Sequence, residues 1–139
     1  MERAKMICGA IRISHLLCAL GLVLVLSGCG TTNSVAKSEG KGIRRTYRVG
    51  YETAWMATRG AIANNDLRVI KLDRKSGTIL AKRGIGMTTF GEHVGVWVRY
   101  VGPDLTSVEV VGRHVGPPVL PGQNPQQPIL DDISTMLDE

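Results

Sequence analysis

Few residues of this chain carry side chains suited to catalysis or metal binding, and the clearest are His93, His114 and Glu92. Imidazoles and carboxylates are common general bases and metal ligands. His93 begins one valine-rich segment, 93–101, and His114 lies near the end of another, 106–115. Apolar and polar residues alternate in both, which predicts two antiparallel strands joined by a Gly-Pro-Asp turn. The register of these strands therefore decides whether the two imidazoles meet.

The preferred register places Val98 opposite Val110 and Arg99 opposite Glu109, because it pairs apolar side chains and opposite charges across the strands. It leaves His93 and His114 on opposite faces, whereas a register one residue tighter would set them face to face. A hydrolase would also need a nucleophile elbow, a free thiol or paired carboxylates, and residues 30–139 offer none of these. We therefore expect a protein that is not an enzyme, with no catalytic residues, no metal site and no cofactor.

Cys29 is the remaining residue with distinctive chemistry. Arg3, Lys5 and Arg12 precede an apolar run over 16–26, which Ser27 and Gly28 separate from Cys29. The run has the length of a signal-peptide core and is short for a membrane-spanning helix, which needs about 20 apolar residues. Residues 26–29 resemble the lipobox of bacterial lipoproteins, an aliphatic residue and two small residues before a cysteine.

The lipobox resemblance implies that residues 1–28 are a cleaved signal peptide and that Cys29 carries a diacylglyceryl thioether. The alternative is an ordinary secretory peptide with an incidental cysteine. Gly30 follows Cys29, whereas an Asp there favours the inner membrane in enterobacterial lipoproteins. We therefore expect the protein at the bacterial cell envelope, lipid-anchored in the outer membrane and facing the periplasm.

Cysteine content and charge limit the partners. Cys8 and Cys18 would leave with the signal peptide, so no disulfide is expected in the mature chain. The sequence has 17 Lys and Arg against 12 Asp and Glu, a formal net charge of +5. A basic chain often binds nucleic acid, but export argues against that here. Anionic lipids or acidic envelope polymers are candidate counter-charges, and a merely solvated basic surface is the alternative.

The mature chain divides into two parts. Residues 29–42 are small and polar without apolar periodicity, which predicts a flexible tether. Residues 43–139 predict one domain in the order β-α-β-β-β-β-α, with a helix from Tyr51, a turn over 73–77 and an amphipathic helix after Pro128. We expect an α+β fold, an antiparallel sheet of about five strands with two helices packed on one face.

This order of elements, with a Trp-bearing first helix and the segment LRVIKLDRKSGTILAKR, is similar to the helix-grip domains of BamC-like envelope lipoproteins. The resemblance covers roughly residues 43–139. It implies binding or scaffolding and no chemistry.

Two helices can cover only one face of the sheet, so the other face is expected to present an apolar patch with Trp97 and Val111, flanked by Arg99 and Arg113. Such a patch marks a binding surface. We therefore expect an accessory lipoprotein that binds another envelope protein there. The alternative is a binder of an anionic polymer, lipid or small ligand in the cleft between helix and sheet, where Arg44, Arg48, Arg99 or Arg113 would hold the anion.

Overall fold

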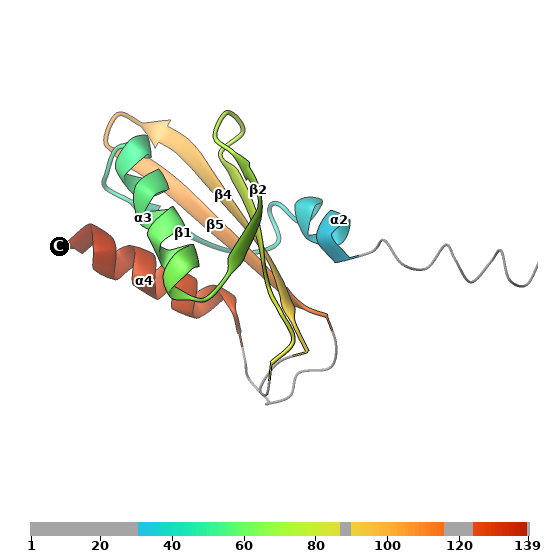
Figure 1. Cartoon of the computed structure of the whole chain (residues 1–139). Helices are drawn as coiled ribbons and strands as arrows, with labels where there is room; N and C mark the ends of the chain where they lie inside the picture. The colour runs from blue at the N-terminus through green and yellow to red at the C-terminus, as the bar shows by residue number, and fades with distance from the viewer. Residues whose placement is uncertain (1–30, 87–89, 116–123, 139) are drawn as a thin grey trace, which may run out of the picture. The chain divides into compact units, whose positions relative to one another are not determined.

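The computed structural model describes residues 31–86, 90–115 and 124–138. The elements follow the chain in the order α2 (Thr31–Ala36), β1 (Ile43–Tyr47), α3 (Tyr51–Asn64), β2 (Arg68–Asp73), β3 (Thr78–Arg83), β4 (Glu92–Gly102), β5 (Leu105–His114) and α4 (Gln126–Asp138) (Figure 1). The five strands form one antiparallel sheet in the order β1-β5-β4-β3-β2. This confirms the predicted α+β class.

Helices α3 and α4 pack on one face of the sheet and enclose the main core (Figure 1). Helix α3 carries Glu52 in its first turn, where the helix dipole favours a carboxylate. It ends at the Asn-Asn-Asp sequence: the side chain of Asn65 donates to the Ala61 carbonyl at 2.9 Å, and Asp66 has a φ of +54°. Trp55 is buried in this core.

The main core is built from one face of the central strands and the apolar stripes of the two helices. Its residues include Val94, Val96 and Val98 of β4, Val108 and Val110 of β5, Trp55, Ala61 and Ile62 of α3, and Ile129, Leu130 and Ile133 of α4.

The opposite face of the sheet is covered by α2, and here the prediction of a flexible tether is wrong for residues 31–42 (Figure 1). Val35 packs with Leu80, Trp97 and Val111 in a second apolar cluster. The helix is only six residues long, so its single apolar contact left no periodic signal in the sequence.

The register of β4 and β5 differs from both registers considered above. Val98 lies opposite Val108 and Trp97 opposite Glu109, with an irregularity between Tyr100 and Gly102. The strands are shifted by two residues from the preferred register. An even shift keeps the valines on one face, so the faces were predicted correctly although the pairs were not.

Strand β2 forms one edge of the sheet. Its pairing with β3 shifts between Val69 and Lys71, so Ile70 is an extra residue at a bulge. The strand is exposed over most of its length, including Val69, Ile70 and Leu72.

Candidate anion-binding site

Four basic side chains form a line across the sheet. The register places Arg68 of β2 opposite Lys82 of β3, Lys82 opposite His93 of β4, and His93 opposite Arg113 of β5. Residues directly opposite each other in an antiparallel sheet project to the same face, with Cβ atoms about 4.5–5.5 Å apart. These four residues, called the basic row below, therefore lie side by side on the face that α2 partly covers.

The basic row is unfavourable for the isolated fold. Arg68 and Lys82 carry like charges directly opposite each other, which is destabilising in a sheet. Among residues 31–86, 90–115 and 124–138, no carboxylate forms an ion pair with any member of the row. Burial and the charge of Lys82 lower the pKa of His93. This arrangement has the electrostatic character of an anion-binding site.

A hollow of about 530 Å³ adjoins the row and is shared by Arg68, Lys82 and His93. The described residues that line it also include Asp66, Arg83, Gly84, Ile85, Phe90, Gly91 and Val115. Asp66 is the one carboxylate among those described lining residues. The hollow is large enough for a phosphate group.

The neighbours of the row fix two of its members. Thr32 Oγ1 lies 3.2 Å from His93 Nδ1, and Arg113 Nη2 donates to Ser38 Oγ at 3.1 Å. In the described part of the chain, His93 Nε2 has no hydrogen-bond partner and so remains a possible donor to an anion.

The predicted interaction surface is corrected by the burial of its apolar members. Trp97 is 2% exposed and Val111 is 4% exposed, because Val35 of α2 covers them. A free apolar patch at these two residues is therefore ruled out. Arg113 belongs to the basic row. Arg99 is held instead by Glu39, whose Oε1 accepts from Arg99 Nε at 2.9 Å.

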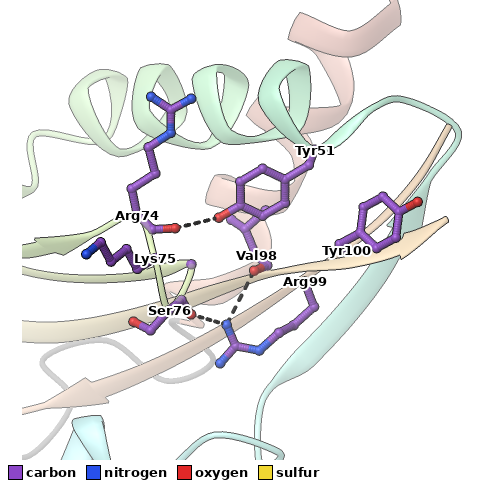
Figure 2. Close-up of a pocket in the computed structure, with 8 residues that line it drawn as sticks. Tyr51, Arg74, Lys75, Ser76, Val98, Arg99 and Tyr100 are labelled. Atoms are coloured by element: carbon purple, nitrogen blue, oxygen red, sulfur yellow. Dashed lines mark hydrogen bonds between the residues drawn. The ribbon is translucent and has the colours of Figure 1, made fainter. Parts of the chain in front are cut away.

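A second hollow, of about 340 Å³, lies at the other end of β3 (Figure 2). The hydroxyl of Tyr51 donates to the Arg74 carbonyl at 3.2 Å, and the guanidinium of Arg99 donates to the Ser76 carbonyl (Figure 2). The two arginines already pair with carboxylates, Arg74 with Glu52 and Arg99 with Glu39. Their charge is thereby compensated, so this hollow is less suited to an anion than the basic row.

The two histidines do not form a metal site. His93 lies opposite Arg113, whereas His114 lies opposite Glu92, so the imidazoles project from opposite faces. His114 Nδ1 is 3.5 Å from Glu92 Oε1, and Arg83 Nη1 is 3.4 Å from Glu92 Oε2. The described residues contain no group of three or more histidine, cysteine, aspartate or glutamate side chains placed to hold a metal ion.

Sequence reasoning missed Arg68 and Lys82 as site residues. The turn over 73–77 indicated the hairpin that pairs them, but both faces of its strands are partly apolar, so the pattern left the register open. Lys82 meets His93 across the 84–91 connection, whose path the sequence did not specify. Only the sheet register brings the four basic residues into one line.

In comparisons with known proteins, no family model matches this chain and no curated protein matches its sequence. The resemblance to BamC-like domains therefore stays a prediction. The predicted signal peptide, the predicted lipobox and Cys29 lie outside the described residues. Within the ranges that the structure describes, no helix has the length and apolar character needed to cross a membrane.

Proposed function

We propose that this chain is a lipid-anchored, non-enzymatic protein of the bacterial envelope whose basic row binds a phosphate-type anion. The observation that carries the proposal is the direct succession of Arg68, Lys82, His93 and Arg113 across four strands. Arginine and lysine bind phosphate through charge-assisted hydrogen bonds. An anion in the adjoining hollow would offset the repulsion within the row.

The location rests on the lipobox at residues 26–29 and remains part of the proposal. The expected binding of another envelope protein at Trp97 and Val111 loses its support, since α2 covers both side chains. Anion recognition needs no rearrangement of α2, so it is the function that the geometry supports best.

The test is a thermal-unfolding titration of the full chain, purified from membranes in a neutral detergent, with inorganic pyrophosphate or with chloride at equal ionic strength. A ligand that binds only the folded state raises the free energy of unfolding, by about 2.7 kcal/mol at a hundred times Kd. We expect the parent protein to be stabilised by pyrophosphate and the double variant Arg68→Gln/Lys82→Gln to lose that response.

The matched control is Arg48→Gln/Arg59→Gln, which removes two charges from exposed positions outside the row. Arg48 was a candidate anion-binding residue from the sequence, but it is not among the described residues that line either hollow. The control variant should respond to pyrophosphate like the parent. In chloride, Arg68→Gln/Lys82→Gln should be at least as stable as the parent, because it relieves like-charge repulsion. An equal pyrophosphate response in the parent and the row variant would exclude the basic row as the binding site.

A further inference from the structure

Exposed apolar side chains lie next to the basic row at one end of the sheet. Ile85 is 82% exposed, and Phe90 and Val115 are each 50% exposed. All three line the same hollow as Lys82 and His93. A site for a small soluble anion has no need of apolar side chains projecting into solvent. Apolar groups beside basic ones are typical of surfaces that rest in the interface of an anionic membrane.

The expected lipid attachment point is close to this surface along the chain. Thr32 contacts His93, with 3.2 Å between Oγ1 and Nδ1. Cys29 comes three residues before Thr32, and three residues of fully extended chain span at most about 11 Å. A lipid on Cys29 would therefore hold the bilayer within a short distance of the row.

The segment after Thr32 contacts the sheet, so it cannot add to the length of chain between Cys29 and the domain. Val35 is buried against Trp97, and the Gly40 and Gly42 amides donate to Glu109 at 2.6 and 3.0 Å. The sequence predicted that residues 29–42 are a tether. Most of that segment is instead docked on the sheet, so only the few residues before α2 are left to separate the domain from a lipid on Cys29.

We propose that the basic row, together with Ile85, Phe90 and Val115, rests on the anionic headgroup layer of the bilayer that holds the lipid of Cys29. This inference rests on the proposed function and names the phosphodiester headgroups of phospholipids as its ligand. The basic side chains contact the headgroup phosphates, while Ile85 and Phe90 enter the boundary with the acyl chains. The turn over 73–77, at the other end of β3, then faces away from the membrane.

The experiment places an environment-sensitive fluorophore on a single cysteine of the lipid-anchored protein, in a background with Cys8 and Cys18 replaced by serine. One variant is Ile85→Cys and its control is Lys75→Cys in the distal turn; both positions are exposed. The protein is reconstituted into vesicles of phosphatidylcholine alone, or of phosphatidylcholine with a third phosphatidylglycerol. Quenching by nitroxide-labelled lipid reports contact with the bilayer.

We expect severalfold stronger quenching at position 85 than at position 75 in the phosphatidylglycerol vesicles. Arg68→Gln/Lys82→Gln should reduce the quenching at position 85, and Arg48→Gln/Arg59→Gln should leave it unchanged. Equal quenching at positions 85 and 75 would overturn the inference. Quenching at position 85 that is independent of phosphatidylglycerol and of the row would overturn the role of the headgroups.

The pyrophosphate titration separates the two proposals. If position 85 stays in water while pyrophosphate still stabilises the protein through the row, the bilayer is not the ligand and the proposed function stands. If the row binds no pyrophosphate and position 85 stays in water, both proposals fail. Mass spectrometry that finds Cys29 without lipid would also overturn this inference, because the short connection to the bilayer would be lost.

Discussion

Arg44 and Glu109 lie directly opposite each other on strands β1 and β5, with 2.5 Å between Nη2 and Oε2. The other carboxylate oxygen accepts from the backbone amides of Gly40 and Gly42 at 2.6 and 3.0 Å. The Glu109 side chain is buried. One carboxylate therefore ties the segment that follows α2 to strands β1 and β5.

Replacing Glu109 by glutamine should loosen that segment. The amide keeps one oxygen but loses the charge, and hydrogen bonds to charged groups contribute about 1.5–3 kcal/mol each. We expect the free energy of unfolding to fall by about 2 kcal/mol in chemical denaturation, with faster hydrogen exchange at Gly40 and Gly42. Asp104→Asn in the exposed β4–β5 turn is the control. An unchanged exchange rate at Gly42 would show that the carboxylate does not hold the segment.

The stabilisation by Glu109 should depend on pH. Burial acts to raise the pKa of Glu109, but the hydrogen bonds from Arg44, Gly42 and Gly40 outweigh it and lower the pKa below 4.5. A lowered folded-state pKa stabilises the fold above the unfolded-state value, and this contribution is lost as the pH falls through the folded-state value. The stability difference between the parent and Glu109→Gln should thus be constant above pH 4.5 and shrink below it. A difference that grows on acidification would contradict this assignment.

Gly95 should be required for the docking of α2. A Cβ at this position would lie 2.5 Å from Trp97 Cη2 and 2.8 Å from Val35 Cγ1. Gly95→Ala should therefore cost about 1–3 kcal/mol through overpacking and shift the fluorine resonance of 5-fluoro-Trp97. Gly84→Ala, where a Cβ meets nothing within 4 Å, is the control. Equal stability of the two alanine variants would mean that Val35 and Trp97 adjust freely.

Anion affinity should rise on acidification because of His93. Burial and Lys82 lower its pKa below the ordinary 6.5, so the free protein keeps this imidazole neutral near pH 7. A bound anion favours the charged imidazole, and binding should therefore take up a proton and tighten severalfold as the pH falls below 6.5. Because pyrophosphate also titrates in this range, the comparison between variants carries the test: calorimetry should show tighter binding on acidification, relative to His93→Gln, for both the parent and His114→Gln. The same pH profile in the parent and in His93→Gln would assign the proton to another group.

Cys29 should be the membrane anchor. Two or more acyl chains hold a protein stably on a bilayer, so Cys29→Ala should move the protein from the membrane fraction to the soluble fraction or leave its leader uncleaved. Fractionation with immunoblotting measures both outcomes, and Cys18→Ala, which keeps the lipobox, is the control. A Cys29→Ala chain that is processed normally and stays on membranes would exclude lipid as the anchor.

The fold was predictable because its signals are local. Alternating valines in β4 and β5 and the 3.6-residue spacing from Tyr51 specify strands and a helix from short stretches of chain. Helix α2 was not predictable in this way, since its docking depends on Val35 meeting Trp97 across 62 positions of sequence. The pattern showed correctly that a second sheet face needed cover, but placed a protein partner there where the chain itself supplies Val35.

The candidate site was less predictable than the fold, for a geometric reason. Arg113 was recognised as a candidate, but Arg68 and Lys82 become its neighbours only through three successive strand registers. A two-residue shift between β4 and β5 leaves the valine face unchanged and yet changes which side chain His93 meets. Apolar patterning therefore identified the faces of the sheet but not the pairs that create the basic row.

The bulge at Ile70 also bears on how copies of the protein meet one another at high concentration. Strand β2 leaves a row of backbone groups unpaired at the edge of the sheet, next to exposed Val69 and Leu72. An irregular, positively charged border of this kind, with Arg68 and Lys71 on either side of the bulge, is a poor template for a strand from a second molecule. We therefore expect concentrated protein to resist growth into fibrils through this edge of the sheet.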